Sequence, residues 1–221
     1  KPPDFWQVSP LRLTRRGKRP LNGSSRKLCW LVSSSEHQMR ERERMIIRPA
    51  THSDVERMDE ICEAAKVAMR NMGIDQWQDD YPNRACWEAD VDDGFAYVAE
   101  TDEGTVVGMF ALVVDAETRD PEPSYGKIDG SWLTPKANYA AVHRVGVAPE
   151  SKGQGIAGMM LDFACNKAAQ MGSASVRIDT HADNKPMQRT LQKAGFISCG
   201  VITLVEGNDA GEQRIAFEKL V

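Results

Sequence analysis

The sequence predicts a mixed α/β fold, with a mostly antiparallel central sheet, one parallel strand pair and helices on both faces. A strand–helix–strand succession over residues 140–180 implies parallel strands joined by a right-handed crossover. Two strand-like apolar runs on either side of the turn TDEG, over residues 95–115, imply antiparallel neighbours. Hydrophobic residues make up 41% of the 221 residues, enough for a sizeable core. No apolar run approaches the roughly 18 residues of a membrane span.

Charge divides the chain into two unequal parts. Residues 1–44 hold eleven Lys or Arg and four Asp or Glu, whereas residues 45–221 hold seventeen and twenty-eight. The first part has four prolines and no sustained apolar period, so we expect a basic, disordered extension, with Met39 or Met45 as candidate natural starts. An arm that binds nucleic acid or a membrane surface is the alternative. The acidic character of residues 45–221 argues against nucleic-acid binding by the folded domain.

The five cysteines are spread along the chain without a CxxC pair or a Cys/His metal-ligand spacing. Reduced thiols in a cytoplasmic protein explain this pattern best. We therefore expect no disulfide framework and no metal site.

The folded part begins with a strand, MIIRPA, at residues 45–50. THSD then offers helix caps, with Ser53 as the expected N-cap. Apolar residues recur at helical spacing until Gly73, which ends the helix. GIDQWQDDYPN, residues 73–83, is irregular and rich in aromatic and acidic side chains, and a short helix over 84–90 follows.

A hairpin comes next, with strands over residues 95–100 and 105–115. YGKIDGSWL, residues 125–133, is expected to add a strand to this meander. The rest of the chain alternates strands and helices. We expect a strand at 140–148, a helix at 155–171, a strand at 175–180, a helix at 184–194 and two final strands in 195–204 and 214–220.

A glycine-rich turn, with Gly153, Gly155 and Gly158, stands between the strand at 140–148 and its helix. The N-terminus of a helix attracts phosphate groups, and glycines let the backbone come close to them. The spacing GxGxxG, with Asp179 about twenty residues on, matches a dinucleotide-binding Rossmann fingerprint. We place the Rossmann interpretation second for two reasons. APESK separates the strand from the first glycine, and the antiparallel meander does not fit a parallel sheet.

The same turn has a second alignment. KGQGIA, residues 152–157, resembles the R/Q-x-x-G-x-G/A motif of the GNAT superfamily of acetyl-CoA-dependent N-acetyltransferases. HRVGVAPE, residues 143–150, is similar to that family's fourth strand, and NKPMQRTLQKAGF, residues 184–196, to its second cofactor motif. Lys152 stands where the family more often has Arg or Gln, but it keeps a positive charge.

The resemblance covers nearly all of residues 45–221 and includes a subgroup signature. A W-x-x-x-Y-P loop lies at 77–82 and a DTH-x-DN-x-PMQ segment at 179–188. The resemblance implies a GNAT fold, in which the parallel strand pair is splayed, and an acyl-CoA N-acyltransferase domain over residues 45–221.

The reaction that the resemblance implies is transfer of an acetyl group from acetyl-CoA to a primary amine, by direct attack in a ternary complex. The family's fourth strand bulges, and Gly146 suggests where this one does so. Backbone groups near Val145 to Val147 would pair with the pantetheine arm and supply an oxyanion donor. The cofactor-binding residues that we expect are Val145, Gly146, Val147, Lys152, Gly153, Gln154, Gly155, Ile156, Ala157, Asn184 and Met187.

Three residues are candidates for proton transfer. His143 alternates in phase with Val145 and Val147, so it is the candidate base; a structural histidine is the alternative. His181 ends the next strand and could relay a proton or order its loop. The tyrosine that the family often uses as general acid is replaced by Leu191, which leaves Tyr139 as a candidate.

The acceptor amine has its own candidate residues. Trp77 and Tyr81, with the carboxylates Asp75, Asp79 and Asp80, could form a cage for a cationic amine, or a surface loop anchored by Trp77. Trp132 could line the same cleft or simply pack in the core, and Asp179 could bind the amine or orient His181.

The sequence leaves two other functions as alternatives. One is a non-catalytic acyl-CoA-binding sensor, which the missing motif tyrosine keeps in view, and the other is an NAD-binding Rossmann oxidoreductase. The partners that we expect are a small-molecule or peptide amine, with no nucleic acid and no membrane, and the resemblance allows a homodimer.

Overall fold

The computed structural model describes residues 45–221, except 79, 115, 117–122, 135–137 and 208. The predicted extension over residues 1–44, and its boundary with a folded domain, lie outside the described residues. The elements of the described part follow the predicted order, and most begin and end within a few residues of the predicted bounds.

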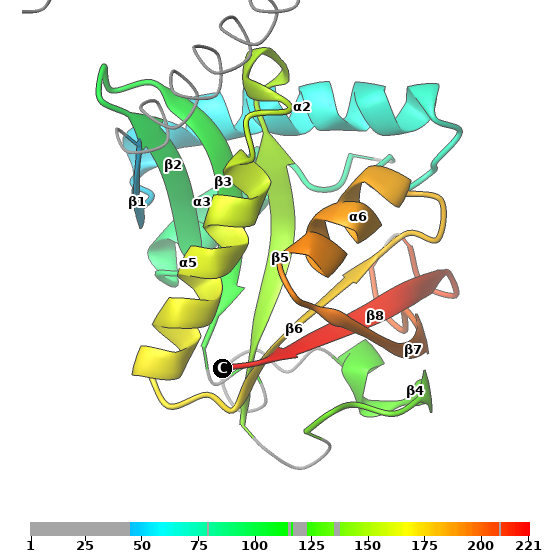
Figure 1. Cartoon of the computed structure of the whole chain (residues 1–221). Coiled ribbons are helices and arrows are strands. Elements are labelled where there is room, and N and C mark those ends of the chain that lie inside the picture. Colours follow the sequence, from blue (N-terminus) through cyan, green and yellow to red (C-terminus); the bar gives the residue numbers. More distant parts are fainter. Residues whose placement is uncertain (1–44, 79, 115, 117–122, 135–137, 208) are drawn as a thin grey trace, which may run out of the picture. The chain divides into compact units, whose positions relative to one another are not determined.

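The described strands form one eight-stranded sheet in the order β1-β2-β3-β5-β6-β8-β7-β4 (Figure 1). Neighbouring strands are antiparallel except β5 and β6. The mixed, mostly antiparallel sheet is thus confirmed, and a doubly wound Rossmann sheet is excluded. The strands are β1 (Met45–Pro49), β2 (Ala96–Thr101), β3 (Val106–Val113), β4 (Ile128–Gly130), β5 (Tyr139–Val147), β6 (Ser175–Thr180), β7 (Ile197–Thr203) and β8 (Gln213–Leu220).

One strand lies where the sequence did not place it. β4 was predicted to continue the meander of β2 and β3, but it pairs with β7 at the opposite edge of the sheet. Local pattern identifies a strand but not its partner, which here lies about seventy residues further along the chain.

Helices cover both faces of the sheet, as predicted. A side-chain carbon at Gly108 of β3 would meet Ile156 and Met160 of α5 (Ile156–Gln170), whereas one at Gly146 of β5 would meet Ile61 of α2 (Val55–Asn71). Gly146 pairs with the residue after Gly108, and successive residues of a strand face opposite sides. Hence α2 and α5 lie on opposite faces. The helix α3 (Arg84–Asp92) packs on α2, and α6 (Lys185–Lys193) packs on α5.

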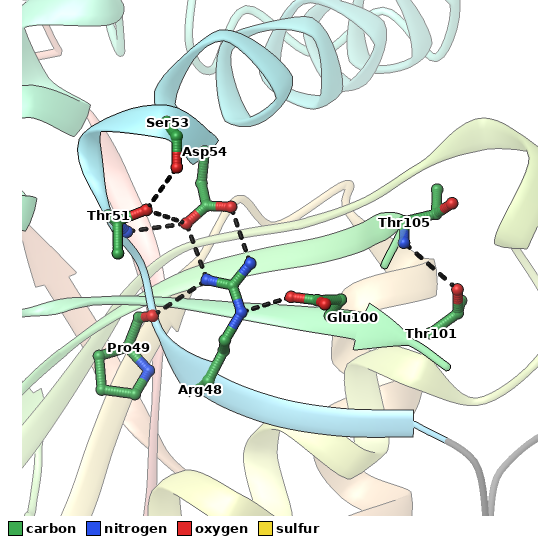
Figure 2. Close-up of polar contacts among 8 residues, drawn as sticks. All are labelled: Arg48, Pro49, Thr51, Ser53, Asp54, Glu100, Thr101 and Thr105. Atoms are coloured by element: carbon green, nitrogen blue, oxygen red, sulfur yellow. Dashed lines mark hydrogen bonds and ion pairs between the residues drawn. The ribbon is translucent and has the colours of Figure 1, made fainter. Parts of the chain in front are cut away.

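The start of α2 differs from the predicted Ser53 cap. A short 3-10 turn, His52–Asp54, precedes the helix, and the Asp54 carboxylate accepts hydrogen bonds from the Thr51 N–H and hydroxyl, both at 2.8 Å. Arg48 of β1 donates two further bonds to Asp54 and one to Glu100 of β2 (Figure 2). Thr51 is thus the N-cap, and the carboxylate three residues later accepts from its backbone N–H. This capping box takes the place of the predicted Ser53 cap.

β5 has its bulge earlier than predicted. His143 pairs with Ala111 of β3, and Gly146 pairs with Met109, so the two β5 residues 144–145 face a single β3 residue. The expected bulge at Gly146 is therefore wrong by one to two positions. Gly146 is required for another reason, the close packing of Met109, whose Cε would lie 2.8 Å from a side-chain carbon there.

The bulge also changes which residues share a face. Arg144 takes a left-handed conformation, with φ 54°, which is uncommon for a residue with a side chain. His143 and Gly146 then lie on one face, and Val147, which pairs with Gly108, lies on the other. The predicted phase of His143 with Val145 and Val147 is wrong, because an extra residue interrupts the alternation.

The parallel strands β5 and β6 are paired over only three residues each, Tyr139–Ala141 with Ser175–Arg177. Beyond Ala141 they diverge, as Figure 1 shows. The predicted splayed pair is thus present. None of the described helices is long and apolar enough to cross a membrane.

Candidate active site

A cleft of about 1090 Å³ opens where β5 and β6 diverge. Its walls come from α2, the loop before α3, the turn before α5, the start of α6 and the β7–β8 connection. Most of the predicted site residues line it: Trp77, Tyr81, His143, Val145, Gly146, Val147, Lys152, Gly153, Gly155, Ile156, Ala157, Asp179, Asn184 and Met187. Five do not: Asp75, Trp132, Tyr139, Gln154 and His181.

The glycine-rich turn forms one end of this cleft. Gly153 and Gly155 have left-handed backbones, with φ 83° and 84°, and Gly155 precedes α5 without any side-chain cap. A side-chain carbon at Gly153 would have no protein atom within 4 Å. The first backbone N–H groups of α5 therefore border open space in the cleft, next to the cation of Lys152. This arrangement fits a diphosphate group.

The start of α6 forms the adjoining wall. The side-chain oxygen of Asn184 accepts a hydrogen bond from the Met187 N–H at 3.2 Å, which confirms the predicted N-cap. Leu191, further along the helix, is completely buried. An apolar residue beneath the surface gives no proton donor at this position.

His143 lines the cleft and lies near Tyr125 of a short 3-10 turn (Pro123–Gly126) and near Asp179 of β6. Its ring stacks on that of Tyr125 with centroids 6.4 Å apart, and the Tyr125 hydroxyl donates a hydrogen bond of 2.9 Å to Asp179 of β6. Burial, followed by the positive charge of Arg144, lowers the pKa of His143 to about 3. The imidazole is therefore neutral at physiological pH. Tyr125 was not among the predicted site residues.

Arg144 ties the bulge of β5 to the aromatic loop. Its guanidinium donates to both oxygens of Asp90 on α3, at 2.6 and 2.9 Å, and to the Tyr81 hydroxyl at 3.1 Å. Burial raises the pKa of Tyr81 against the opposing effect of the Arg144 charge, so the phenol keeps its proton at neutral pH. Arg144 was not among the predicted site residues, because the bulge that turns it toward the cleft leaves no local pattern in the sequence.

Two predicted aromatics surround a buried ion pair instead of the cleft. Arg177 lies 4.2 Å above the ring of Trp132 and 3.9 Å from that of Tyr139, and it pairs with Glu218 of β8. Trp132 donates its indole N–H to the backbone carbonyl of Tyr125 at 3.0 Å. Both rings therefore pack around a buried guanidinium.

Two polar candidates also lie outside it. His181 accepts a hydrogen bond from the Asp183 N–H at 3.1 Å and thus orders its loop. Asp75 is exposed to solvent. In the residues that the structure describes, no group of three His, Cys, Asp or Glu side chains could hold a metal ion.

The β7–β8 connection supplies a wall that sequence reasoning missed. Leu204, Glu206, Gly207 and Asp209 line the cleft, together with Arg214 of β8. Arg214 is only 1% exposed and bonds Asp209 at 2.6 Å. The only signal in the sequence was an arginine directly before the apolar stretch IAF, residues 215–217.

Comparison with known proteins identifies the relatives of this fold. The family model described as Acetyltransferase (GNAT) family matches residues 58–196. No curated protein matches the chain. A GNAT-family acetyltransferase structure from Streptococcus agalactiae is 28% identical, with a TM-score of 0.68 over 80% of this chain and 95% of that one.

Two more distant structures share the fold. A GNAT superfamily phosphinothricin acetyltransferase from Sinorhizobium meliloti, in complex with AcCoA, is 14% identical, with a TM-score of 0.57 over 80% of this chain and 88% of that one. A ribosomal-protein-alanine N-acetyltransferase from Brucella melitensis is 20% identical, with a TM-score of 0.54 over 80% and 99%.

Proposed function

The chain belongs to the GNAT family of acetyltransferases, and from this we propose that it transfers an acetyl group from acetyl-CoA to a primary amine by direct attack in a ternary complex. One observation carries the proposal. The splayed strands β5 and β6, the uncapped glycine-rich start of α5 and the neutral His143 border a single cleft. When bound, acetyl-CoA supplies the activated thioester.

We propose that the cofactor-binding residues that line the cleft have the roles expected for them. Lys152 and the backbone N–H groups at 153–157 would hold the diphosphate. The backbone groups of Val145–Val147 that point away from β3 would pair with the pantetheine arm as an added strand. One of these N–H groups would donate to the attacked carbonyl oxygen as negative charge develops there.

The amine must lose a proton before it attacks. An aliphatic ammonium has a pKa of about 10, so a proton acceptor is needed. The neutral imidazole of His143 faces the cleft and would accept that proton. Because its pKa is about 3, it is a weak base, and we propose that the proton passes quickly to water in the cleft.

The thiolate leaving group needs a proton or a donor. Leu191 supplies none, and Tyr139 does not line the cleft. Tyr81 lines it, is protonated at neutral pH and has its hydroxyl oxygen held by Arg144. We propose Tyr81 as the donor, in place of the predicted Tyr139.

The acceptor side of the cleft combines aromatic and acidic groups. Trp77 and Tyr81 present rings, and Asp179 presents a carboxylate at the end of β6. Together they suit an ammonium group before its deprotonation. Asp75, Trp132 and His181 lie away from the cleft lining, so we assign them no contact with the substrate.

We also propose a cellular location for the protein from the state of its cysteines. Burial raises the pKa of Cys62 to about 12 and of Cys165 to about 11, so both thiols are unreactive and protonated. The described cysteines form no disulfide, which supports a cytoplasmic location. The homodimer remains a prediction.

The first test is calorimetric titration of the full chain with acetyl-CoA, with NAD as control, followed by thiol release with a panel of amines. We expect acetyl-CoA binding, no response to NAD, and amine-dependent thiol release. Binding without thiol release for any amine would favour the sensor function. No binding of acetyl-CoA would overturn both.

The glycine-rich turn can be tested with a matched pair of variants. Lys152→Gln should weaken acetyl-CoA binding about tenfold at low salt and less at high salt, since it removes a cation beside the diphosphate. Lys127→Gln removes an exposed cation that does not line the cleft. This variant should bind acetyl-CoA with unchanged affinity. Equal affinities for the two variants would contradict the assigned place of the diphosphate.

A further inference from the structure

Arg214 carries a buried hydrogen-bond donor without a partner in the cleft wall. The residue is 1% exposed, and its Nε makes no hydrogen bond with any part of the chain that the structure describes. Its other nitrogens are used: Nη2 donates to Asp209 at 2.6 Å and Nη1 to the carbonyl of Gln213 at 3.0 Å. A buried charged group with an unsatisfied donor costs free energy, which a ligand oxygen would recover.

The sheet places this donor on the acceptor side of the cleft. Ala216 of β8 pairs with Asp179 of β6, and Arg214 lies two residues from Ala216, so the Arg214 and Asp179 side chains share a face. Ala141 pairs with Arg177, which puts His143 on that face as well. Arg214, Asp179 and His143 all line the cleft.

The charges around Arg214 select the kind of oxygen. Asp209 already neutralises the guanidinium at 2.6 Å, and Glu212 approaches it to 3.9 Å. Glu206 adds another carboxylate to the cleft lining. A carboxylate ligand would meet repulsion from these groups, whereas a neutral carbonyl oxygen accepts from Nε without adding charge.

We propose that Arg214 is a specificity-determining residue that binds an amide carbonyl of the acceptor. The acceptor is then an amine that carries a neutral amide, as in an amino-acid amide or a peptide amino terminus, in preference to a free amino acid. This inference rests on the proposed acetyl transfer. A site built around a donor discriminates strongly against analogues that lack the matching oxygen.

The test uses two matched series of amines with the full chain and acetyl-CoA. Glycinamide, glycine and ethylamine form one series; leucinamide, leucine and 3-methylbutylamine form the other. The variant Arg214→Lys keeps a cation beside Asp209 but loses Nε and the planar fork. Arg189→Lys, on an exposed residue of α6 outside the cleft lining, is the control.

The readout is the ratio of kcat/KM for the amide to that for the oxygen-free amine. Differences in amine pKa cancel when this ratio is compared between variants. We expect the ratio to fall about tenfold or more in Arg214→Lys and to stay within twofold in Arg189→Lys. A ratio that is unchanged in Arg214→Lys overturns the proposal, whereas its acetyl-CoA affinity and melting temperature report whether the variant is folded.

A second variant tests the charge argument without touching Arg214. Asp209→Asn keeps an oxygen for Nη2 but removes the negative charge, so the rate with glycine should rise at least about threefold relative to glycinamide. An unchanged ratio contradicts selection of a neutral oxygen. Turnover of oxygen-free amines alone overturns this inference and leaves the acetyl transfer standing, whereas bound acetyl-CoA with no thiol release in either series overturns both.

Discussion

At the scale of single residues, His143 shows how position decides chemistry. Its neighbour Arg144 enters a left-handed conformation and turns its charge into the cleft wall. That charge and the burial of the ring both oppose protonation of the imidazole. The residue is therefore a neutral hydrogen-bonding group over the whole physiological range, unlike an exposed histidine.

This property gives a direct prediction. The imidazole nitrogens of His143 should keep the NMR shifts of the neutral ring from pH 8 to pH 4, because its pKa is about 3. The signals are assigned by their loss in His143→Gln. A midpoint near the ordinary value of about 6.5 would contradict the role of Arg144 and burial.

The same shift has a consequence for stability, with a definite sign. Between about pH 6.5 and pH 3 the unfolded chain binds a proton at His143 that the folded chain does not. Folding therefore becomes less favourable as the pH falls through this window.

At the scale of elements, the start of α2 depends on side chains from three segments. Arg48 and Thr51 hold Asp54, and Arg48 also reaches Glu100 of β2. These bonds lower the pKa of Asp54 to about 2, with the Arg48 hydrogen bond as the largest cause. They join the first strand, its neighbour and the first helix (Figure 2).

Asp54→Asn should therefore destabilise the fold by up to about 2 kcal/mol at pH 7. The folded pKa lies below the unfolded one, so this stabilisation is fully present above about pH 4 and is lost as the pH falls toward 2. Urea unfolding at pH 7 and pH 2.5 measures the difference between the variants. Asp59→Asn is the control, and an equal loss in both variants would count against the network.

The β4–β7 edge offers a second prediction at this scale. Gly130 and Gly200 pair directly, and a side-chain carbon on Gly200 would lie 2.2 Å from the backbone oxygen of Asp129. Gly200→Ala should cost more than about 3 kcal/mol, because backbone cannot yield as a flexible side chain can.

The control for this change is Gly172→Ala. Gly172 also has a positive φ, 86°, but a side-chain carbon there would meet nothing within 4 Å. It should cost only the conformational strain, about 1–2 kcal/mol. Thermal unfolding compares the two, and similar melting temperatures would show that the close approach is unimportant.

At the scale of the whole molecule, the sequence predicted what depends on local pattern. The strands, helices, the glycine-rich turn and the Asn184 cap all have signals within a few residues. The sheet order does not, and β4 was misplaced because its partner is distant in sequence. The β5 bulge was misplaced because it follows from packing against β3, not from the glycine.

The residues that line the cleft also differ in whether a local sequence pattern predicts them. Residues of the two cofactor motifs were predicted, because each motif is contiguous. Arg144 and Arg214 line the cleft but were not among the predicted residues, since each reaches it only through the pairing of strands that are distant in sequence. Trp132 and Tyr139 do not line the cleft, because a buried arginine, Arg177, packs against both rings.

The short pairing of β5 with β6 has a consequence for hydrogen exchange. Along β5, alternate amides point to β3 and to β6, except at the bulge of residues 144–145. Beyond Ala141 the second set has no ladder partner on β6 and borders the cleft. Deuterium should enter these amides much faster than their β3-bonded neighbours, so that one strand shows an alternating rate pattern. Acetyl-CoA should slow the fast set alone; uniform protection along the strand before ligand is added would mean that the gap closes in solution.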